Sequence, residues 1–157
     1  MIIEQAKVTD AEEILSLQKL AYKSEAEIYK DFNIAPLIQT LEEIKRDFEN
    51  QVLLKAVTEG KIIGSVRAFA KEDSCYIGRL IVHPDFQNRG FGTKLINEIE
   101  GVFNLSRRFE LFTGHKSEKN IHFYQKLGYK TFKTEKITDN INFIYMEKIN
   151  SSSISDL

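Results

Sequence analysis

The stretch that decides the fold is CYIGRLIVHPDFQNRGFGTKLINEIE, from Cys75 to Glu100. Its apolar run ends at His83-Pro84, where proline stops a strand and disfavours helix just before it. A polar turn that carries Gly90 and Gly92 follows, and apolar residues then recur at helical spacing. The predicted order is strand, glycine-bearing loop and helix. This order directs backbone N–H groups and the positive end of a helix dipole to one place, which suits a phosphate or pyrophosphate.

The glycines do not identify the ligand by themselves. The sequence does not match the dinucleotide pattern G-x-G-x-x-G, because the chain continues beyond Gly92 to Lys94 and Leu95 without the third glycine. The nucleotide-triphosphate pattern G-x-x-x-x-G-K-[ST] is absent from the sequence. An ordinary strand-to-helix turn would also use glycines for tight geometry. What remains is Q-x-x-G-x-G over Gln87–Gly92, directly after Val-His-Pro. This segment resembles the acetyl-CoA pyrophosphate loop of the GNAT N-acetyltransferase superfamily.

Size and composition are those of an ordinary soluble, single-domain protein. The chain has 157 residues, of which 42% are hydrophobic and 29% charged, and its formal net charge is -1. The near-neutral charge gives no basic field for nucleic acid. No apolar run approaches the ~20 residues that a membrane span needs. We therefore expect neither nucleic acid nor a membrane as a partner, and we expect a cytoplasmic location.

The single cysteine, Cys75, excludes an internal disulfide and a multi-cysteine metal site. A small buried side chain is a better interpretation of Cys75 than a nucleophile. We accordingly expect no metal.

The periodicity along the chain predicts the order β-α-α-β-β-β-α-β-α-β-β. Thr9, with Glu12 three residues later, is expected to cap the first helix, Ala35-Pro36 to break the chain, and Thr40 to begin the second helix. Residues 1–150 are expected to form one domain and residues 151–157 a flexible tail. Strands are expected over residues 1–6, 51–58, 61–70, 75–82, 109–113, 129–136 and 141–149, and further helices over 91–100 and 120–127.

A second motif supports the same family. The segment Ile121–Tyr129, IHFYQKLGY, resembles the family's aromatic-Tyr-x-x-x-Gly-aromatic sequence. The resemblance covers nearly the whole chain and is least specific over residues 22–50. It implies the acyl-CoA N-acyltransferase fold, an α/β (α+β) architecture with a mixed central sheet of about seven strands and helices on both faces.

The resemblance also implies an activity and the residues that carry it. The activity would be transfer of the acetyl group of acetyl-CoA to a primary amine, on a small molecule, peptide or protein, by direct attack in a ternary complex. Tyr124 would protonate the leaving thiolate, because the reference pKa of a phenol, ~10, lies above that of a thiol. In family structures the central strands splay apart and free backbone amides for the ligand. The acetyl-CoA contacts would come from Leu80, Ile81, Val82, Gln87, Asn88, Arg89, Gly90, Phe91, Gly92 and Thr93.

The sequence departs from the family pattern at two places. Many members carry an asparagine seven residues before the catalytic tyrosine, where this chain has Ser117, while Asn120 stands four residues before it. Either residue could bind the pantetheine arm, and Asn120 is slightly favoured. Tyr76 and Phe112 occupy the two positions where members carry a glutamate as general base. The base therefore stays open between a solvent chain and several acids and histidines: Glu25, Glu27, Glu110, His83, His115 and His122.

The segment from Tyr22 to Pro36 occupies the part of the fold that usually lines the acceptor side. Glu25, Glu27 and Asp31 could hold a cationic amine between Tyr22 and Tyr29 as walls, although a solvated acidic helix face is an equally good interpretation. The identity of the amine and the presence of a homodimer stay open. The alternative function is a non-catalytic acyl-CoA-binding or sensor domain, and a nucleotide-binding regulatory module is a weaker one.

Overall fold

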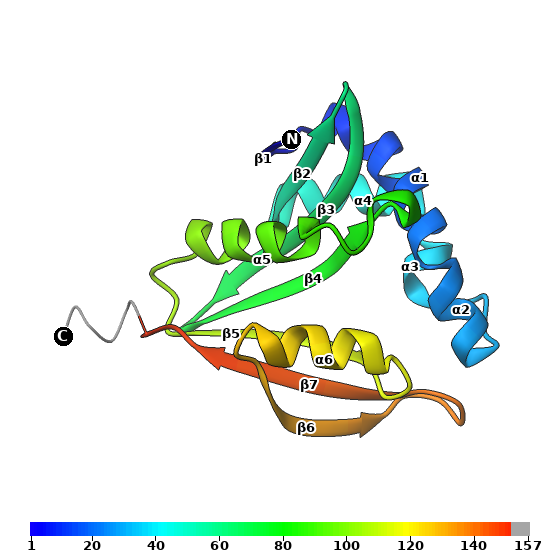
Figure 1. Ribbon diagram of the computed structural model, residues 1–157, viewed down its shortest axis with the longest axis vertical. Helices are drawn as coiled ribbons and strands as arrows, with labels where there is room; N and C mark the ends of the chain where they lie inside the picture. The colour runs from blue at the N-terminus through cyan, green and yellow to red at the C-terminus, as the bar shows by residue number, and fades with distance from the viewer. Residues whose placement is uncertain (152–157) are drawn as a thin grey trace.

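The computed structural model describes residues 1–151 and shows a single seven-stranded sheet (Figure 1). Apart from Ser151, the predicted tail over residues 151–157 lies outside the described residues. The strand order is β1-β2-β3-β4-β5-β7-β6, with every neighbouring pair antiparallel except β4 and β5, which are parallel. The predicted mixed sheet is thus confirmed. Its strands are β1 (Ile2–Gln5), β2 (Val52–Thr58), β3 (Lys61–Lys71), β4 (Ser74–Val82), β5 (Arg108–Gly114), β6 (Lys130–Lys136) and β7 (Asn142–Ile149).

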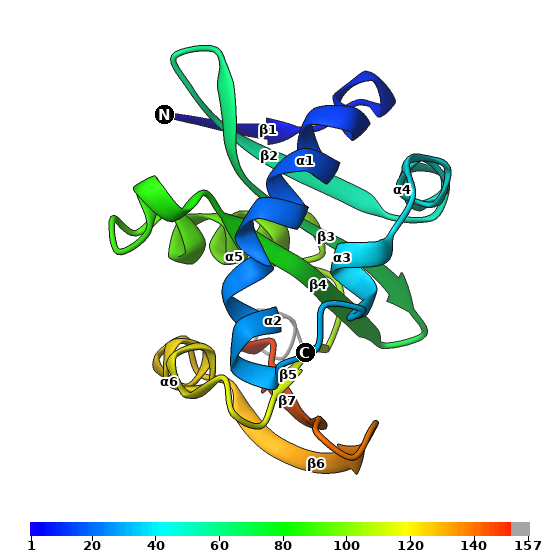
Figure 2. The same ribbon diagram turned by 90° about the vertical axis from the view of Figure 1, so that its right-hand side faces the viewer.

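Helices cover both faces of the sheet (Figure 2). One face carries α5 (Phe91–Val102) and α6 (Glu118–Lys126), and the other carries the helices that precede β2. The described helices are all too short or too polar to span a membrane. The helices before β2 are η1 (Val8–Asp10), α1 (Ala11–Ala21), α2 (Lys23–Tyr29), α3 (Ala35–Ile38) and α4 (Leu41–Asn50), and a 3-10 turn, η2 (Pro84–Phe86), follows β4.

The alternation of side chains along the strands builds two apolar cores, one on each face. Leu95 and Ile99 of α5 pack on one core, whereas Ile14 of α1 and Ile44 of α4 pack on the other. Cys75 is fully buried in the first core, and burial raises its pKa to about 12. The thiolate is therefore scarce at neutral pH, and the prediction of a small buried side chain at this position is confirmed.

Two local predictions about the N-terminal helices are wrong. Thr9 does not cap α1, because the Asp10 carboxylate accepts hydrogen bonds from the Lys7 backbone N–H and from Lys55 Nζ, both at 2.9 Å. These bonds wind residues 8–10 into a 3-10 turn that contains Thr9. Pro36 does not break the chain either, since it lies in the first turn of α3, where its missing N–H has no partner to lose.

The predicted start of the second helix is confirmed at Thr40. Its hydroxyl accepts from the Glu43 backbone N–H at 3.2 Å, and the Glu43 carboxylate accepts from the Thr40 backbone N–H at 2.9 Å. This reciprocal pair satisfies two donors that a helix N-terminus would otherwise leave unpaired.

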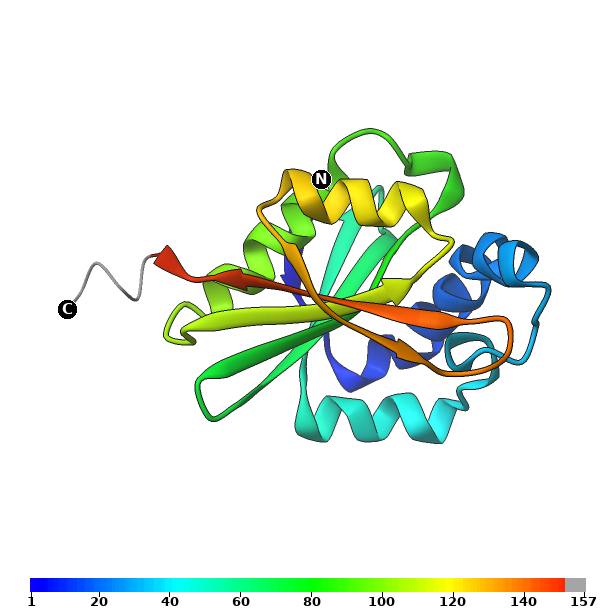
Figure 3. The same ribbon diagram turned by 90° about the horizontal axis from the view of Figure 1, so that it is seen from below.

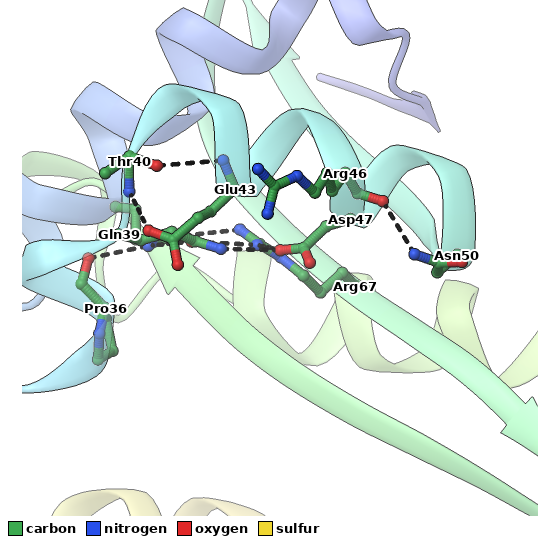
Figure 4. A network of polar contacts seen from close by, with 9 residues as sticks. Pro36, Gln39, Thr40, Glu43, Arg46, Asp47, Asn50 and Arg67 are labelled. Atoms are coloured by element: carbon green, nitrogen blue, oxygen red, sulfur yellow. Dashed lines mark hydrogen bonds and ion pairs between the residues drawn. The ribbon is translucent and has the colours of Figure 1, made fainter.

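A buried arginine ties the N-terminal helices to the sheet (Figure 4). The Arg67 side chain on β3 is 2% exposed, and its guanidinium donates to Asp47 Oδ2 at 2.7 Å and to Gln18 Oε1 at 2.6 Å. Gln39 Nε2 donates to the same Asp47 oxygen at 2.9 Å, and Gln18 Nε2 donates to the Pro36 carbonyl at 2.9 Å. Burial lowers the pKa of Arg67, while the Asp47 carboxylate opposes that shift. The network joins α1, α3 and α4 to the centre of β3.

Candidate active site

The parallel strands β4 and β5 diverge, which opens the middle of the sheet (Figure 1). Their pairing runs only from Ser74 opposite Arg108 to Tyr76 opposite Glu110. β4 nevertheless continues to Val82, so within residues 1–151 its last six residues have no ladder partner on β5. Backbone groups that face β5 along this stretch are available to a ligand, because unpaired backbone donors and acceptors need a partner.

A β-bulge reshapes β4 inside this opening. Arg79 has a φ of 51°, in the left-handed region that an arginine rarely adopts. On either side of it, Gly78 pairs with Arg67 and Ile81 pairs with Ser65 of β3, so two residues of β4 oppose one of β3. A bulge of this kind kinks the strand and re-aims its backbone groups.

The N-terminus of α5 lies at the end of β4, after the η2 turn. Gly90 precedes the helix with a φ of 84°, and Asn88 has a φ of 63°. The Lys94 backbone N–H bonds the Gly90 carbonyl at 3.1 Å, so the N–H groups of residues 91–93 have no acceptor within the helix. The Gln87 side chain donates to the Val82 carbonyl at 3.3 Å and closes the loop back onto the strand. The loop therefore presents unpaired donors at a positive helix end.

Glycine is needed at the two loop positions for different physical reasons. A Cβ at Gly90 would meet no atom within 4 Å, so only its positive φ requires glycine there. A Cβ at Gly92 would lie 3.2 Å from Phe123 Cζ, so glycine there lets α5 approach α6 closely. The Arg89 guanidinium lies 5.3 Å from the centre of the Phe86 ring, on the exposed outer side of the loop.

Tyr124 of α6 is partly buried, and its hydroxyl makes no hydrogen bond with any described residue. Its ring lies 6.0 Å from that of Tyr129, centre to centre. Burial raises the pKa of Tyr124, and the neighbouring Tyr22 and Glu25 raise it further. The phenol therefore keeps its proton near neutral pH, as an acid catalyst must.

A group of hydrogen bonds, which we call the α2–α6 latch, holds the start of α6. It consists of Glu25, Tyr29, Ser117 and Asn120. The Ser117 hydroxyl donates to Glu25 Oε2 at 2.5 Å, and the Asn120 amide donates to Glu25 Oε1 at 3.2 Å. The Tyr29 hydroxyl lies 2.7 Å from Ser117 Oγ and accepts from the Lys116 backbone N–H at 3.0 Å. Ser117 is the residue that precedes α6, so the latch fixes the helix that carries Tyr124.

Residues 19–150 match the family model described as an acetyltransferase (GNAT) domain. The chain belongs to the GNAT acetyltransferase family.

One curated relative and two solved structures illustrate what the chain is similar to. The chain is 25% identical over 139 residues to UPF0157 protein YqkA of Bacillus subtilis. This match covers 88% of this chain and 40% of YqkA. It thus spans less than half of that relative. The structure of smu.2055 from Streptococcus mutans superposes with a TM-score of 0.83 at 15% identity, covering 96% of this chain and 99% of that one. The structure of the PaiA N-acetyltransferase of Thermoplasma acidophilum, in complex with coenzyme A, superposes with a TM-score of 0.69 at 21% identity. The match covers 95% of this chain and 99% of that one. These two structures share the GNAT fold.

Of the four residues that were expected to bind the acceptor, three lie near one another: Tyr22, Glu25 and Tyr29. Glu25 and Tyr29 are engaged in the α2–α6 latch, and Glu27 is exposed. Tyr22 is partly buried near the opening, where burial raises its pKa while the guanidinium groups of Arg79 and Arg67 oppose that shift.

Two further candidates have structural partners of their own. Asp31 accepts from the backbone N–H of residue 33 at 2.8 Å and so stabilises a turn. Of the two pantetheine candidates, Ser117 uses its hydroxyl within the latch.

The two positions where the family resemblance implied a glutamate as general base carry aromatic rings. Tyr76 stacks on Phe69 with ring centres 5.3 Å apart, and Phe112 stacks on Phe143 at 4.5 Å.

Other candidate bases already have partners. Glu110 is paired with Arg108 at 2.9 Å, His83 Nδ1 accepts from the Asp85 backbone N–H at 3.0 Å, and His115 Nδ1 accepts from the Asn142 backbone N–H at 2.9 Å. His122 lies exposed on α6.

The structure also reveals residues that sequence reasoning missed. Arg67 and Arg79 both act electrostatically on Tyr22, and the side-chain partners Asp47 and Gln18 of Arg67 come from α4 and α1. One signal was present, because Arg67 interrupts an otherwise apolar strand, where a charged side chain needs a buried partner. No pattern indicated the bulge at Arg79.

The latch predicts unequal effects of two neighbouring acids. We expect Glu25→Ala to lower the free energy of unfolding by about 1–2 kcal/mol, because the hydroxyl of Ser117 and the amide of Asn120 lose a charged acceptor. Glu27→Ala, which removes an exposed carboxylate from the same helix, should change it by less than about 0.5 kcal/mol. Urea unfolding of both variants measures the difference. Equal stabilities would show that the latch contributes nothing.

Proposed function

We propose that this protein transfers the acetyl group of acetyl-CoA to a primary amine by direct attack in a ternary complex. The observation that carries the proposal is the opening between β4 and β5, together with the α5 N-terminus at its end. The opening offers strand amides to an extended acyl carrier, and the helix end offers unpaired N–H groups to a pyrophosphate.

The residues present fit such a donor. Backbone groups of Leu80, Ile81 and Val82 would bind the acetyl and pantetheine portions, because they lie past the last pair with β5. Amides from Asn88 to Thr93 would bind the pyrophosphate, and the Arg89 side chain is exposed and can turn toward it. The Asn120 amide nitrogen is engaged with Glu25 and with Thr113 Oγ1 at 3.4 Å, whereas its oxygen makes no hydrogen bond with the described residues. That oxygen is available to a pantetheine N–H.

The chemistry needs one proton donor and a neutral amine. The amine nitrogen attacks the thioester carbonyl carbon, a C–N bond forms, the C–S bond breaks, and the electron pair goes to sulfur. Tyr124 gives the sulfur its proton and later regains one from solvent, while the proton on the attacking nitrogen leaves to water. The raised pKa of Tyr124 keeps the phenol in its acid form for this step.

Gly90→Val tests the donor site. At a φ of 84° a β-branched residue is strongly disfavoured, so the loop must change shape and withdraw its amides. We expect the dissociation constant for acetyl-CoA, measured by isothermal titration calorimetry, to rise at least tenfold, which corresponds to about 1.4 kcal/mol.

Gly101→Val is the matched control for this variant. Gly101 is exposed on α5, its Cβ would also meet open space, and its φ is not positive. The control should keep the affinity of the unchanged protein. A folded Gly90→Val protein with unaltered affinity would refute the assignment of the loop.

Turnover separates an enzyme from a binding domain. A panel of amines, amino acids and peptides with a free N-terminus, assayed for release of the CoA thiol, should yield at least one acceptor. Titrations with acetyl-CoA, CoA and ATP show which ligand the chain prefers. Tight acetyl-CoA binding without thiol release from any amine would favour the non-catalytic sensor, and preference for ATP would favour a nucleotide-binding module.

A further inference from the structure

Four aromatic rings lie together on the side of β5, β7 and β6 that is opposite α6. We call this set, Phe112, Phe132, Phe143 and Tyr145, the aromatic face. The Phe112 ring centre lies 4.5 Å from that of Phe143 and 5.5 Å from that of Tyr145. Tyr145 is 6.4 Å from Phe132. The four rings therefore form one continuous surface across three strands.

Strand alternation explains why these rings share a side. On β5, Phe109 and Leu111 point into the core, so Phe112 points the other way. On β7, Met146 is buried in the core and Tyr145, which pairs with Phe112, faces outward. Figure 3 shows α6 on one side of these strands. Phe112 remains 46% exposed and Phe132 43% exposed on the other side.

The charged side chains beside the aromatic face are paired with one another. Arg108 bonds Glu110 at 2.9 Å and Glu147 at 3.1 Å, and its guanidinium lies 5.3 Å from the centre of the Phe132 ring. Lys133 lies 3.9 Å from Glu135 and 4.3 Å from the centre of the Tyr145 ring. This side of the sheet thus combines exposed rings with carboxylates that have internal partners. It suits a planar apolar group better than a polycation, which would need unpaired carboxylates.

The aromatic face borders the opening between β4 and β5. The last parallel pair joins Tyr76 to Glu110, and Phe112 is the next outward-pointing residue of β5, beyond the point where the strands separate. Tyr76 and Phe69 extend the aromatic character across β4 and β3. If the amine of a ligand entered the opening from this side, the remainder of the ligand would contact the aromatic rings.

We propose that the aromatic face binds the acceptor, and that the acceptor is a primary amine bearing an aromatic or similarly planar apolar group. The inference rests on the proposed N-acetyltransferase function and names the substrate class for that site. Stacked or edge-to-face aromatic pairs add about 0.5–1.5 kcal/mol beyond area burial, which amounts to a preference of roughly twofold to tenfold. Exposed apolar patches of this kind commonly mark binding surfaces.

Three amines test the proposal: phenethylamine, butylamine and spermidine. We expect kcat/KM to be at least tenfold higher for phenethylamine than for the other two. Phe112→Ala should remove most of this preference by raising the Michaelis constant for phenethylamine about tenfold, while the Michaelis constant for acetyl-CoA stays unchanged. Leu105→Ala is the control, because it truncates an apolar side chain that is 89% exposed beyond the other end of β5. It should leave the preference intact.

Binding without turnover separates this inference from the proposed function. Calorimetric titration of phenethylamine onto the protein saturated with CoA should give an affinity that Phe112→Ala weakens and Leu105→Ala does not. If acetyl-CoA fails to bind, the proposed function falls, and titration of the same amine without CoA still tests the face. Preference for spermidine, or an aryl preference that survives Phe112→Ala, would overturn the inference. A dimer in light scattering that Phe112→Ala dissociates would assign the face to a second copy of the chain and overturn it equally.

Discussion

Tyr124→Phe should lower the turnover number about 10²- to 10⁴-fold, the usual loss when a general acid is removed. The ring still packs against Tyr129, so the dissociation constant for acetyl-CoA should stay nearly unchanged. Because burial raises the pKa of Tyr124, the unchanged enzyme should show no loss of rate from phenol ionisation between about pH 7 and 10. Steady-state kinetics over this pH range, with calorimetry for donor binding, measure both effects.

Tyr129→Phe is the matched control for the loss of a hydroxyl. The Tyr129 hydroxyl donates to Glu100 Oε2 at 2.7 Å, within the core and outside the candidate site. That variant should lose stability and keep its turnover number. If Tyr124→Phe turns over as fast as the unchanged enzyme, in a regime where chemistry limits the rate, the thiolate takes its proton from water.

Asp47→Ala should cause the largest loss of stability, about 3 kcal/mol, because it leaves the Arg67 guanidinium buried without its counter-ion. The Arg67 side chain is 2% exposed and Asp47 is 25% exposed, which places the expected cost at the lower end for a broken buried pair. Gln18 would remain as a neutral partner of Arg67, and so would Gln39, which Figure 4 shows. A loss of this size is a large share of the roughly 5–15 kcal/mol that stabilises a typical domain, and guanidinium unfolding would reveal it.

Two further variants show whether charge is the cause. Asp47→Asn keeps an acceptor for Arg67 and should lose less stability than Asp47→Ala. Asp47→Leu combined with Arg67→Met removes both charges and should also lose less than Asp47→Ala, because no unpaired ion stays buried. An Asp47→Ala protein within about 1 kcal/mol of the unchanged one would show that water reaches Arg67 and replaces the carboxylate.

Several parts of the candidate site could be predicted from short-range patterns. The apolar run in β4, the break at Pro84 and the helical spacing after the glycine-bearing loop predicted the strand, loop and helix that the structure contains. The Thr40 cap was predictable for the same reason, since both of its bonds join residues three apart. Such features depend on neighbours within one helical turn or one strand, which the sequence displays directly.

Features made by distant partners were not predictable in this way. Glu25 has the spacing of a solvent-facing acid, yet it bonds residues 92 and 95 positions away. Asp10 displaced Thr9 as the organising residue of the first turn because Lys55, from β2, lies against its carboxylate. The aromatic face likewise arises only when β5, β7 and β6 lie side by side.

The sequence by itself determined the seven strands, the glycine-bearing loop and the helix that carries Tyr124, because backbone periodicity and turn chemistry are local. Only the tertiary structure decided that Glu25 fastens α6, that the network around Arg67 joins three helices to β3, and that exposed rings border the opening of the sheet. The physical reason is that the partner of a polar or aromatic side chain is set by which elements pack together. That choice belongs to the whole fold and leaves no mark on the spacing of residues along the chain.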